Sequence, residues 1–159
     1  MGSVSMGNGD IIGILDLTLL DRGASEEELI RLCERAVAHR VAAVCVFSEH
    51  VRIVRGLLPE EVKVASVVGG FPVGWRDPTK VSKAISEAID FGADEIDCVL
   101  EPTPNGGVSS EEDLQILSAM RDACGEKTLK VIIETPLMDE HSIRATSRLA
   151  MASGADFVK

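Results

Sequence analysis

Short apolar runs alternate with helix-type patterns along the whole chain, and this alternation constrains the fold more than any other feature. The runs are nearly continuous, as is typical of strands buried on both faces of a parallel sheet. A parallel sheet with helical connections fits either a doubly wound sheet or a closed eight-stranded barrel. Six runs are predicted as strands: 11–20, 41–47, 62–68, 95–100, 129–134 and 155–159.

The segments between these runs carry helix signals. Ser25 with Glu28 has the spacing of a capping box, in which each side chain satisfies a backbone N–H of the other residue. Asp77-Pro78 combines an N-cap with proline at the first helical position, and apolar residues then recur at helical spacing. Five connecting helices are predicted to begin near Ser25, Glu49, Asp77, Ser109 and Asp139.

An internal repeat favours the barrel. Phe91-Gly-Ala-Asp-Glu-Ile-Asp97 matches Ser153-Gly-Ala-Asp-Phe-Val-Lys159, two strand–helix units later. In each copy a glycine ends a helix and the chain turns directly into a strand. Alternate strands of an eight-stranded barrel contribute side chains to the same interior layer, so Asp97 and Lys159 are expected to face each other inside. Chance similarity of two Gly-Ala-Asp turns is the alternative.

Lys159 is the candidate nucleophile. The pKa of a free lysine is about 10.4, and burial or a neighbouring cation lowers it. The neutral amine attacks a carbonyl to form an imine, and a nearby carboxylate such as Asp97 moves protons. A buried Lys–Asp salt bridge without catalytic function fits the same spacing. Polar residues interrupt the apolar runs at six positions: Asp16, Thr18, Asp97, Lys130, Glu134 and Lys159.

Other reactive side chains give weaker signals. Cys45, on the second predicted strand, is typical of plain core. The glycine-rich segments 69–74 and 105–107 follow the third and fourth strands, where backbone could approach a ligand, although simple loops fit equally well. The histidines lack the spacing of metal ligands and are interpreted as surface helix residues: His39, His50 and His141.

Charge and composition exclude several classes of protein. The formal net charge of −10 argues against binding to nucleic acid or anionic membranes. No apolar run reaches the roughly 18 residues of a membrane span, and residues 1–10, predicted to be a flexible lead-in, lack the blocks of a signal peptide. None of the four cysteines forms a C-x-x-C pair, so reduced thiols in a cytoplasmic protein are expected.

From Ile11 to its end, the chain resembles the deoxyribose-phosphate aldolase family. The resemblance implies an α/β fold of the (βα)8 TIM-barrel family and a Schiff-base mechanism without metal or organic cofactor. It also implies reversible aldol cleavage of 2-deoxy-D-ribose 5-phosphate to acetaldehyde and D-glyceraldehyde 3-phosphate. Six segments carry the resemblance in order: Leu15-Asp-Leu-Thr-Leu19, Ala42-Ala-Val-Cys-Val46, Gly70-Phe-Pro-Val-Gly74, Gly92-Ala-Asp-Glu-Ile-Asp97, Lys130-Val-Ile-Ile-Glu-Thr135 and Gly154-Ala-Asp-Phe-Val-Lys159.

The resemblance also implies residue roles. By position, Lys159 corresponds to the Schiff-base lysine, Asp97 to the carboxylate that transfers protons, and Asp16 to its supporting partner. Pro136 replaces a glycine and Trp75 a smaller or polar residue, which bears on substrate breadth rather than reaction class. Three further positions correspond to residues that line or support the substrate site: Thr18, Cys45 and Lys130.

The chain is short for a complete barrel, which needs about 250 residues. We expect residues 11–159 to form a partial barrel domain, truncated after the sixth strand, with open first and sixth strands. A second lysine that would lower the pKa of Lys159 and the phosphate-binding loops would then be missing. We therefore expect an aldolase that acts when a second chain or a homo-oligomer completes the barrel. The alternatives are a non-catalytic half-barrel that self-associates or binds a partner, and a class I aldolase for another sugar phosphate.

Overall fold

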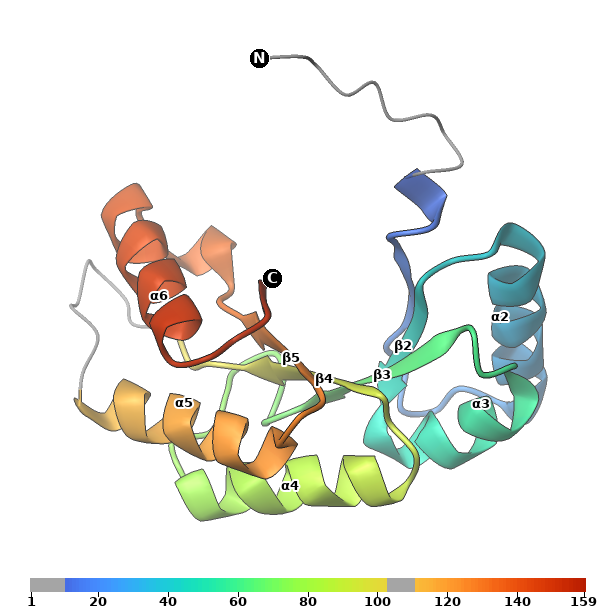
Figure 1. Ribbon diagram of the computed structural model, residues 1–159, viewed down its shortest axis with the longest axis horizontal. Coiled ribbons are helices and arrows are strands. Elements are labelled where there is room, and N and C mark those ends of the chain that lie inside the picture. Colours follow the sequence, from blue (N-terminus) through green and yellow to red (C-terminus); the bar gives the residue numbers. More distant parts are fainter. Residues whose placement is uncertain (1–10, 103–110) are drawn as a thin grey trace.

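The computed structural model describes residues 11–102 and 111–159, which form one curled parallel sheet with helices on its outer side (Figure 1). The sheet order follows the chain order from β1 to β6, and every neighbouring pair is parallel. A doubly wound sheet would instead reverse direction at a switch point, so the barrel alternative is correct. The strands are β1 (Asp16–Leu19), β2 (Ala43–Phe47), β3 (Lys63–Val68), β4 (Glu95–Val99), β5 (Thr128–Ile132) and β6 (Phe157–Val158).

The predicted connecting helices are present, and their caps explain where they begin. Ser25 and Glu28 form the predicted capping box, Asp77 accepts from the N–H groups of the next helix, and Asp139 does the same. Every helix in the described ranges is too short or too polar to cross a bilayer. The helices are α2 (Glu26–His39), α3 (Val51–Leu57), α4 (Pro78–Asp90), α5 (Glu111–Cys124) and α6 (Glu140–Ala152), with 3-10 turns η1 (Ser48–His50) and η2 (Thr135–Leu137).

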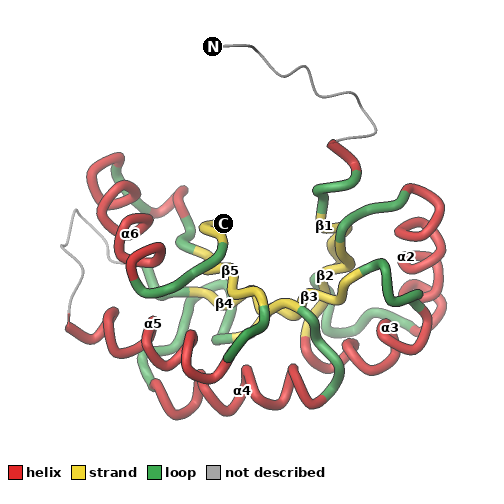
Figure 2. Tube along the Cα trace, in the orientation of Figure 1, coloured by secondary structure: helices red, strands yellow, loops and turns green. Residues whose placement is uncertain are grey.

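The sheet curls so that its helices lie on the convex side and its concave side is left open (Figure 2). Alternate residues of each strand therefore enter different cores, because successive side chains point to opposite faces. The larger core joins the strands to the helices, and a smaller one on the concave side includes Cys45, Val67 and Ile132. Within the described residues, β1 pairs only with β2 and β6 only with β5. The described part is a partial barrel with two open edges, as predicted.

Each strand is offset from its predicted range, by one or two residues for most of them and by five at the start of the first. Of residues 11–20 only Asp16–Leu19 are strand, because residues 11–15 close local turns through Ile14 N–H to Ile11 O and Leu15 N–H to Ile12 O. The fifth strand ends at Ile132, since Glu134 has a left-handed backbone with φ of 46°. Three predicted features lie outside the described residues: the lead-in 1–10, the turn at 105–107 and the cap at Ser109.

The internal repeat has a structural counterpart. In the first copy, Asp94 accepts hydrogen bonds from a backbone N–H of β3 at 3.0 Å and from Arg55 at 2.9 Å. In the second, Asp156 accepts from a backbone N–H of β5 at 2.8 Å and from Arg121 at 3.1 Å. Each arginine also donates to carbonyls of the adjoining turns. Both Gly-Ala-Asp turns thus tie a strand to its neighbour, three residues before an inward-facing polar side chain.

Candidate active site

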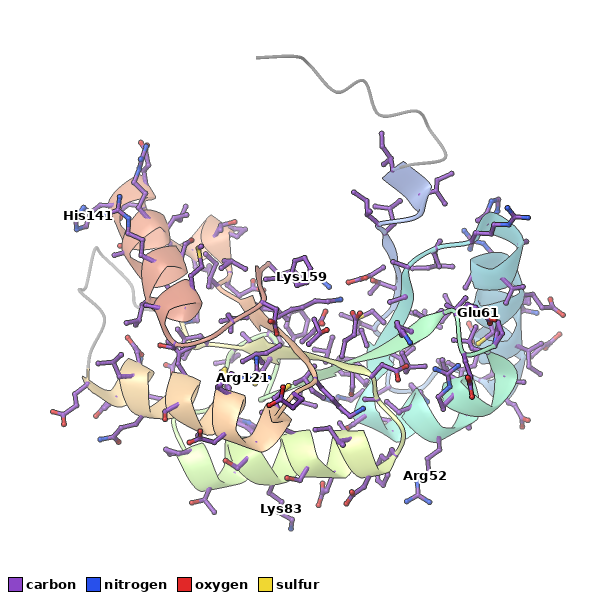
Figure 3. The ribbon with its side chains drawn as sticks, viewed as in Figure 1. Arg52, Glu61, Lys83, Arg121, His141 and Lys159 are labelled. Atoms are coloured by element: carbon purple, nitrogen blue, oxygen red, sulfur yellow. The ribbon has the colours of Figure 1, made fainter. Side chains whose placement is uncertain are left out.

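Side chains from alternate strands meet on the concave face. Lys159, directly after β6, places its Nζ 2.5 Å from Oδ2 of Asp97 on β4. The Cys45 thiol of β2 donates to the same oxygen at 3.6 Å. Figure 3 shows Lys159 on the concave side of the sheet. The juxtaposition of Asp97 and Lys159 predicted from the repeat is therefore confirmed, and Cys45 belongs to the same group.

A second group comes from β1 and β5. Lys130 Nζ lies 2.7 Å from Asp16 Oδ2, 2.6 Å from Glu95 Oε2 and 3.5 Å from Asp97 Oδ1. Asp16 Oδ2 is also 3.2 Å from the Nζ of Lys159. Asp16 and Lys130 thus join the cluster as expected, but Glu95 was missed by the sequence reasoning. The sequence could have identified Glu95, because it stands two residues before Asp97 and therefore lies on the same face of the strand.

The charge of this cluster acts against a neutral Lys159. Burial lowers the pKa of Lys159, but the hydrogen bond and charge of Asp97, followed by Cys45 and Asp16, raise it overall. Three carboxylates face two ammonium groups, and the second ammonium, of Lys130, already has short ion pairs of its own. The Lys159 side chain is also 42% exposed. The expectation of a buried amine with a lowered pKa is therefore wrong for the described residues.

A cavity of about 340 Å³ adjoins Lys159 at the carboxyl ends of the strands, the end at which TIM-barrel enzymes carry their active sites. Glu134 lines it, although it lies beyond the strand on which it was predicted to share a face with Lys130. The remaining lining residues are largely apolar: Thr18, Leu20, Cys45, Val67, Phe71, Ile132, Thr135 and Pro136. The cavity thus brings Thr18 and Cys45 together with Lys159.

The Cys45 thiol stays protonated near neutral pH. Burial, and then the charge of Asp97, raise its pKa to about 12, so it donates rather than accepts in its contact with that carboxylate. His50 was predicted to be a surface residue but is buried, with Nε2 2.9 Å from the carbonyl of Asp21. Among the described residues no group of three or more His, Cys, Asp or Glu side chains could hold a metal ion.

The glycine-rich loop after β3 shapes the cavity wall. Gly70 has φ of +84°, and a Cβ there would lie 2.2 Å from the indole Nε1 of Trp75. Its close packing on Trp75 therefore requires glycine. Phe71, the next residue, lines the cavity beside Lys159. The departure noted at Trp75 is thus a packing feature of this loop.

Replacing Lys130 with methionine is expected to lower the free energy of unfolding by about 3–5 kcal/mol at pH 7, the usual cost of removing one partner from a buried ion pair. The Lys130 side chain is only 8% exposed, and the variant leaves three carboxylates without their shared ammonium. Urea unfolding measures the loss. Lys83→Met, at an exposed pair with Glu87 on α4, is the control and should change stability by less than about 0.5 kcal/mol.

The difference in free energy of unfolding between the unchanged chain and Lys130→Met should depend on pH. Burial raises the pKa of Asp16, but hydrogen bonds and charges from Lys130 and Lys159 outweigh burial and lower it overall. A lowered carboxyl pKa gives stability that is present above the unfolded value and lost as the pH falls through the folded value. The difference between the unchanged chain and Lys130→Met should therefore narrow below about pH 4. A difference that is constant from pH 7 to pH 3 would contradict the ion-pair account.

Known proteins share this sequence and arrangement. The model of the DeoC/LacD family of aldolases matches residues 11–159. The deoxyribose-phosphate aldolase of Ureaplasma urealyticum is 37% identical over 147 residues, which cover 91% of this chain and 67% of the relative.

Solved structures agree on the fold. A structure from Coccidioides immitis, provisionally assigned as a deoxyribose-phosphate aldolase, superimposes with a TM-score of 0.85 at 30% identity, covering 98% of this chain and 62% of that one. The tetrameric deoxyribose-phosphate aldolase of Aeropyrum pernix superimposes with a TM-score of 0.80 at 24% identity, covering 94% and 63% of the two chains. The chain thus spans roughly two thirds of the length of these relatives and has the fold of their barrels.

Proposed function

The chain belongs to the DeoC/LacD family of aldolases, and from this premise we propose that it cleaves 2-deoxy-D-ribose 5-phosphate reversibly through a Schiff base on Lys159. The products are acetaldehyde and D-glyceraldehyde 3-phosphate. The observation that carries the proposal is the 2.5 Å contact between Lys159 Nζ and Asp97 Oδ2, on the concave face and beside a cavity that contains Lys159.

The reaction needs Lys159 as a free amine. Moving a proton from its Nζ to Asp97 Oδ2, 2.5 Å away, converts the ion pair into a neutral pair. The amine then attacks the C1 aldehyde of the open-chain sugar. Asp97 returns its proton to the carbinolamine hydroxyl, which leaves as water, so that a protonated imine forms and Asp97 is a carboxylate again. Lys159 is protonated before the first transfer, because its pKa is raised. The transfer to Asp97 can still supply the free amine, since the proton acceptor is already in contact.

Cleavage follows from the imine. A base removes the proton of the C3 hydroxyl, the C2–C3 bond breaks, and its electron pair passes to the iminium, leaving an enamine on Lys159. Glyceraldehyde 3-phosphate departs. Protonation of the enamine at C2 and hydrolysis then release acetaldehyde and restore the amine. We assign these proton transfers to Asp97, directly or through one water.

The remaining site residues support this centre. Asp16 and Lys130 form the charged network beneath the Lys159–Asp97 pair. Thr18 and Cys45 line the cavity, where we propose that they contact the substrate. Cys45 is not needed as a nucleophile, because its raised pKa keeps it protonated.

The relatives are longer than this chain, and their length suggests what could complete the barrel. Since the chain spans 67% of the Ureaplasma enzyme, we propose that full activity belongs to a complete barrel, in which further strands pair with β1 and β6. A second chain or a homo-oligomer could supply them. The partners we propose are otherwise small molecules, a phosphorylated sugar and an aldehyde, and the setting we propose is the cytoplasm.

A cleavage assay tests the proposal. The chain is incubated with 2-deoxy-D-ribose 5-phosphate, alone and with a peptide covering the additional third of a relative, and released acetaldehyde is measured. Release from this sugar and not from other sugar phosphates is expected. Release from a different sugar phosphate alone would favour another class I aldolase. No release under any condition would favour the non-catalytic half-barrel.

A further inference from the structure

Lys130 is held by two short ion pairs from neighbouring layers of the concave face. Its Nζ lies 2.6 Å from Glu95 Oε2 and 2.7 Å from Asp16 Oδ2. Both carboxylates are mostly buried, each with a side chain 18% exposed. Because ion pairs at this distance and burial are strong and directional, they fix where the ammonium sits.

The two carboxylate oxygens of Asp97 differ in their hydrogen-bond partners. Oδ2 accepts from Lys159 and Cys45, whereas Oδ1 is buried and has no hydrogen-bond partner within the described residues. Lys130 Nζ lies 3.5 Å from Oδ1, a longer ion pair than its contacts with Glu95 and Asp16. A buried carboxylate oxygen without a partner is costly, so something must keep the ammonium of Lys130 from closing the gap.

We propose that Glu95 is a positioning residue that holds the Lys130 ammonium away from Asp97 Oδ1 and so keeps Asp97 a strong enough base for the aldol reaction. This inference rests on the proposed function, in which Asp97 takes up the proton. Glu95 lines a different cavity, together with Lys130 and Lys159, and is absent from the one at the carboxyl ends of the strands. It acts through Lys130, by competing with Asp97 for the same ammonium.

Among the charged groups around Asp97, Lys130 is the one whose position depends on Glu95. On β3, Ala65 and Val67 lie beside Glu95 and Asp97, and neither titrates. Lys63, which shares their strand face, is exposed and donates to the carbonyl of Glu60 at 3.3 Å. Loss of the Glu95 charge acts on Asp97 in one direction, because it removes a like charge and frees an opposite one, and both effects favour the carboxylate. The titratable groups that face Asp97 are Asp16 on β1, Cys45 on β2, Glu95 on β4, Lys130 on β5 and Lys159 after β6.

Glu95→Gln in the full chain tests the inference with two readouts that need no catalysis. The titration midpoint of the Asp97 ¹³Cγ signal should fall, because loss of a like charge and a closer ammonium both favour the carboxylate. A crystal structure of the variant should show Lys130 Nζ within hydrogen-bonding distance of Asp97 Oδ1. The acid side of the cleavage rate profile should move to lower pH, with a fall in kcat and little change in KM.

Control variants separate positioning from simple loss of charge or of fold. Glu140→Gln removes a 2.6 Å ion pair with Arg144 on the exposed side of α6 and should leave the Asp97 midpoint unchanged. Glu95→Asp keeps the charge but withdraws it by one methylene, so a smaller shift in the same direction is expected, and it serves if Glu95→Gln does not fold.

Two results would overturn the inference: an Asp97 midpoint that does not fall, or a Lys130 ammonium that stays in place after Glu95 is changed. If the unchanged chain cleaves no sugar phosphate, the proposed function fails instead. The titration and the variant structure still decide the position of Lys130.

Discussion

The Lys159→Leu chain is expected to lose cleavage of 2-deoxy-D-ribose 5-phosphate by at least about a thousandfold, as is usual when a covalent nucleophile is removed. Leucine is similar in bulk but has no amine, so no imine can form and the C2–C3 bond has no electron sink. The measurement is kcat/KM from the rate of acetaldehyde release, with the unchanged chain and the variant assayed under the same conditions.

Two controls distinguish loss of the Lys159 amine from misfolding of the variant. The Lys159 side chain is 42% exposed at the end of the sheet, so leucine there should be tolerated, and circular dichroism of the variant should match that of the unchanged chain. Lys83→Leu, on the exposed side of α4, should retain full activity. Cleavage that survives in a folded Lys159→Leu chain would show that another residue is the nucleophile.

The Asp97→Asn chain is expected to turn over about 10²- to 10⁴-fold more slowly, the typical contribution of a positioned general acid–base group. Asparagine keeps the shape of the side chain but cannot take up the proton. Because Asp97 raises the pKa of Lys159 more than Cys45 or Asp16 does, its replacement should lower that pKa. Imine formation should therefore fall less than turnover, because an amine with a lower pKa depends less on Asp97 as its proton acceptor, whereas the later proton transfers still require Asp97.

A larger loss of turnover than of imine formation would identify Asp97 as the group that transfers protons. Imine formation is followed by reduction with borohydride, and turnover by acetaldehyde release. Asp122→Asn, at an exposed position of α5, should affect neither. Equal losses of imine and turnover would instead indicate that Asp97 serves only to hold Lys159 in place.

Much of this arrangement follows from periodic features of the sequence. The alternation of apolar runs and capped helices predicts the order of elements, and the Gly-Ala-Asp repeat predicts that Asp97 and Lys159 face each other, because the layers of a barrel repeat with its strands. Strand ends are less predictable. Residues 11–15 are as apolar as a strand, yet they close local turns, since pairing with β2 begins only at Leu15.

The electrostatics of the site could not be read from local sequence. Lys130 and Asp16 are separated by 114 positions, and whether the pKa of Lys159 rises or falls depends on how many such charges the fold gathers. Glu95 is the first residue of the predicted fourth strand, and the role proposed for it rests on its 2.6 Å contact with Lys130. Position in the barrel is encoded by periodicity, whereas the balance of charge is set by contacts between distant strands.

Borohydride reduction of the chain in the presence of acetaldehyde, followed by peptide mapping, shows which lysine forms a Schiff base. The proposed mechanism requires the Lys159 amine, beside Asp97, to condense with the aldehyde. It predicts N-ethyl-lysine at position 159 in preference to every other lysine, and none in Lys159→Leu. An unmodified Lys159, with the ethyl group on Lys130 or spread over surface lysines, would contradict it.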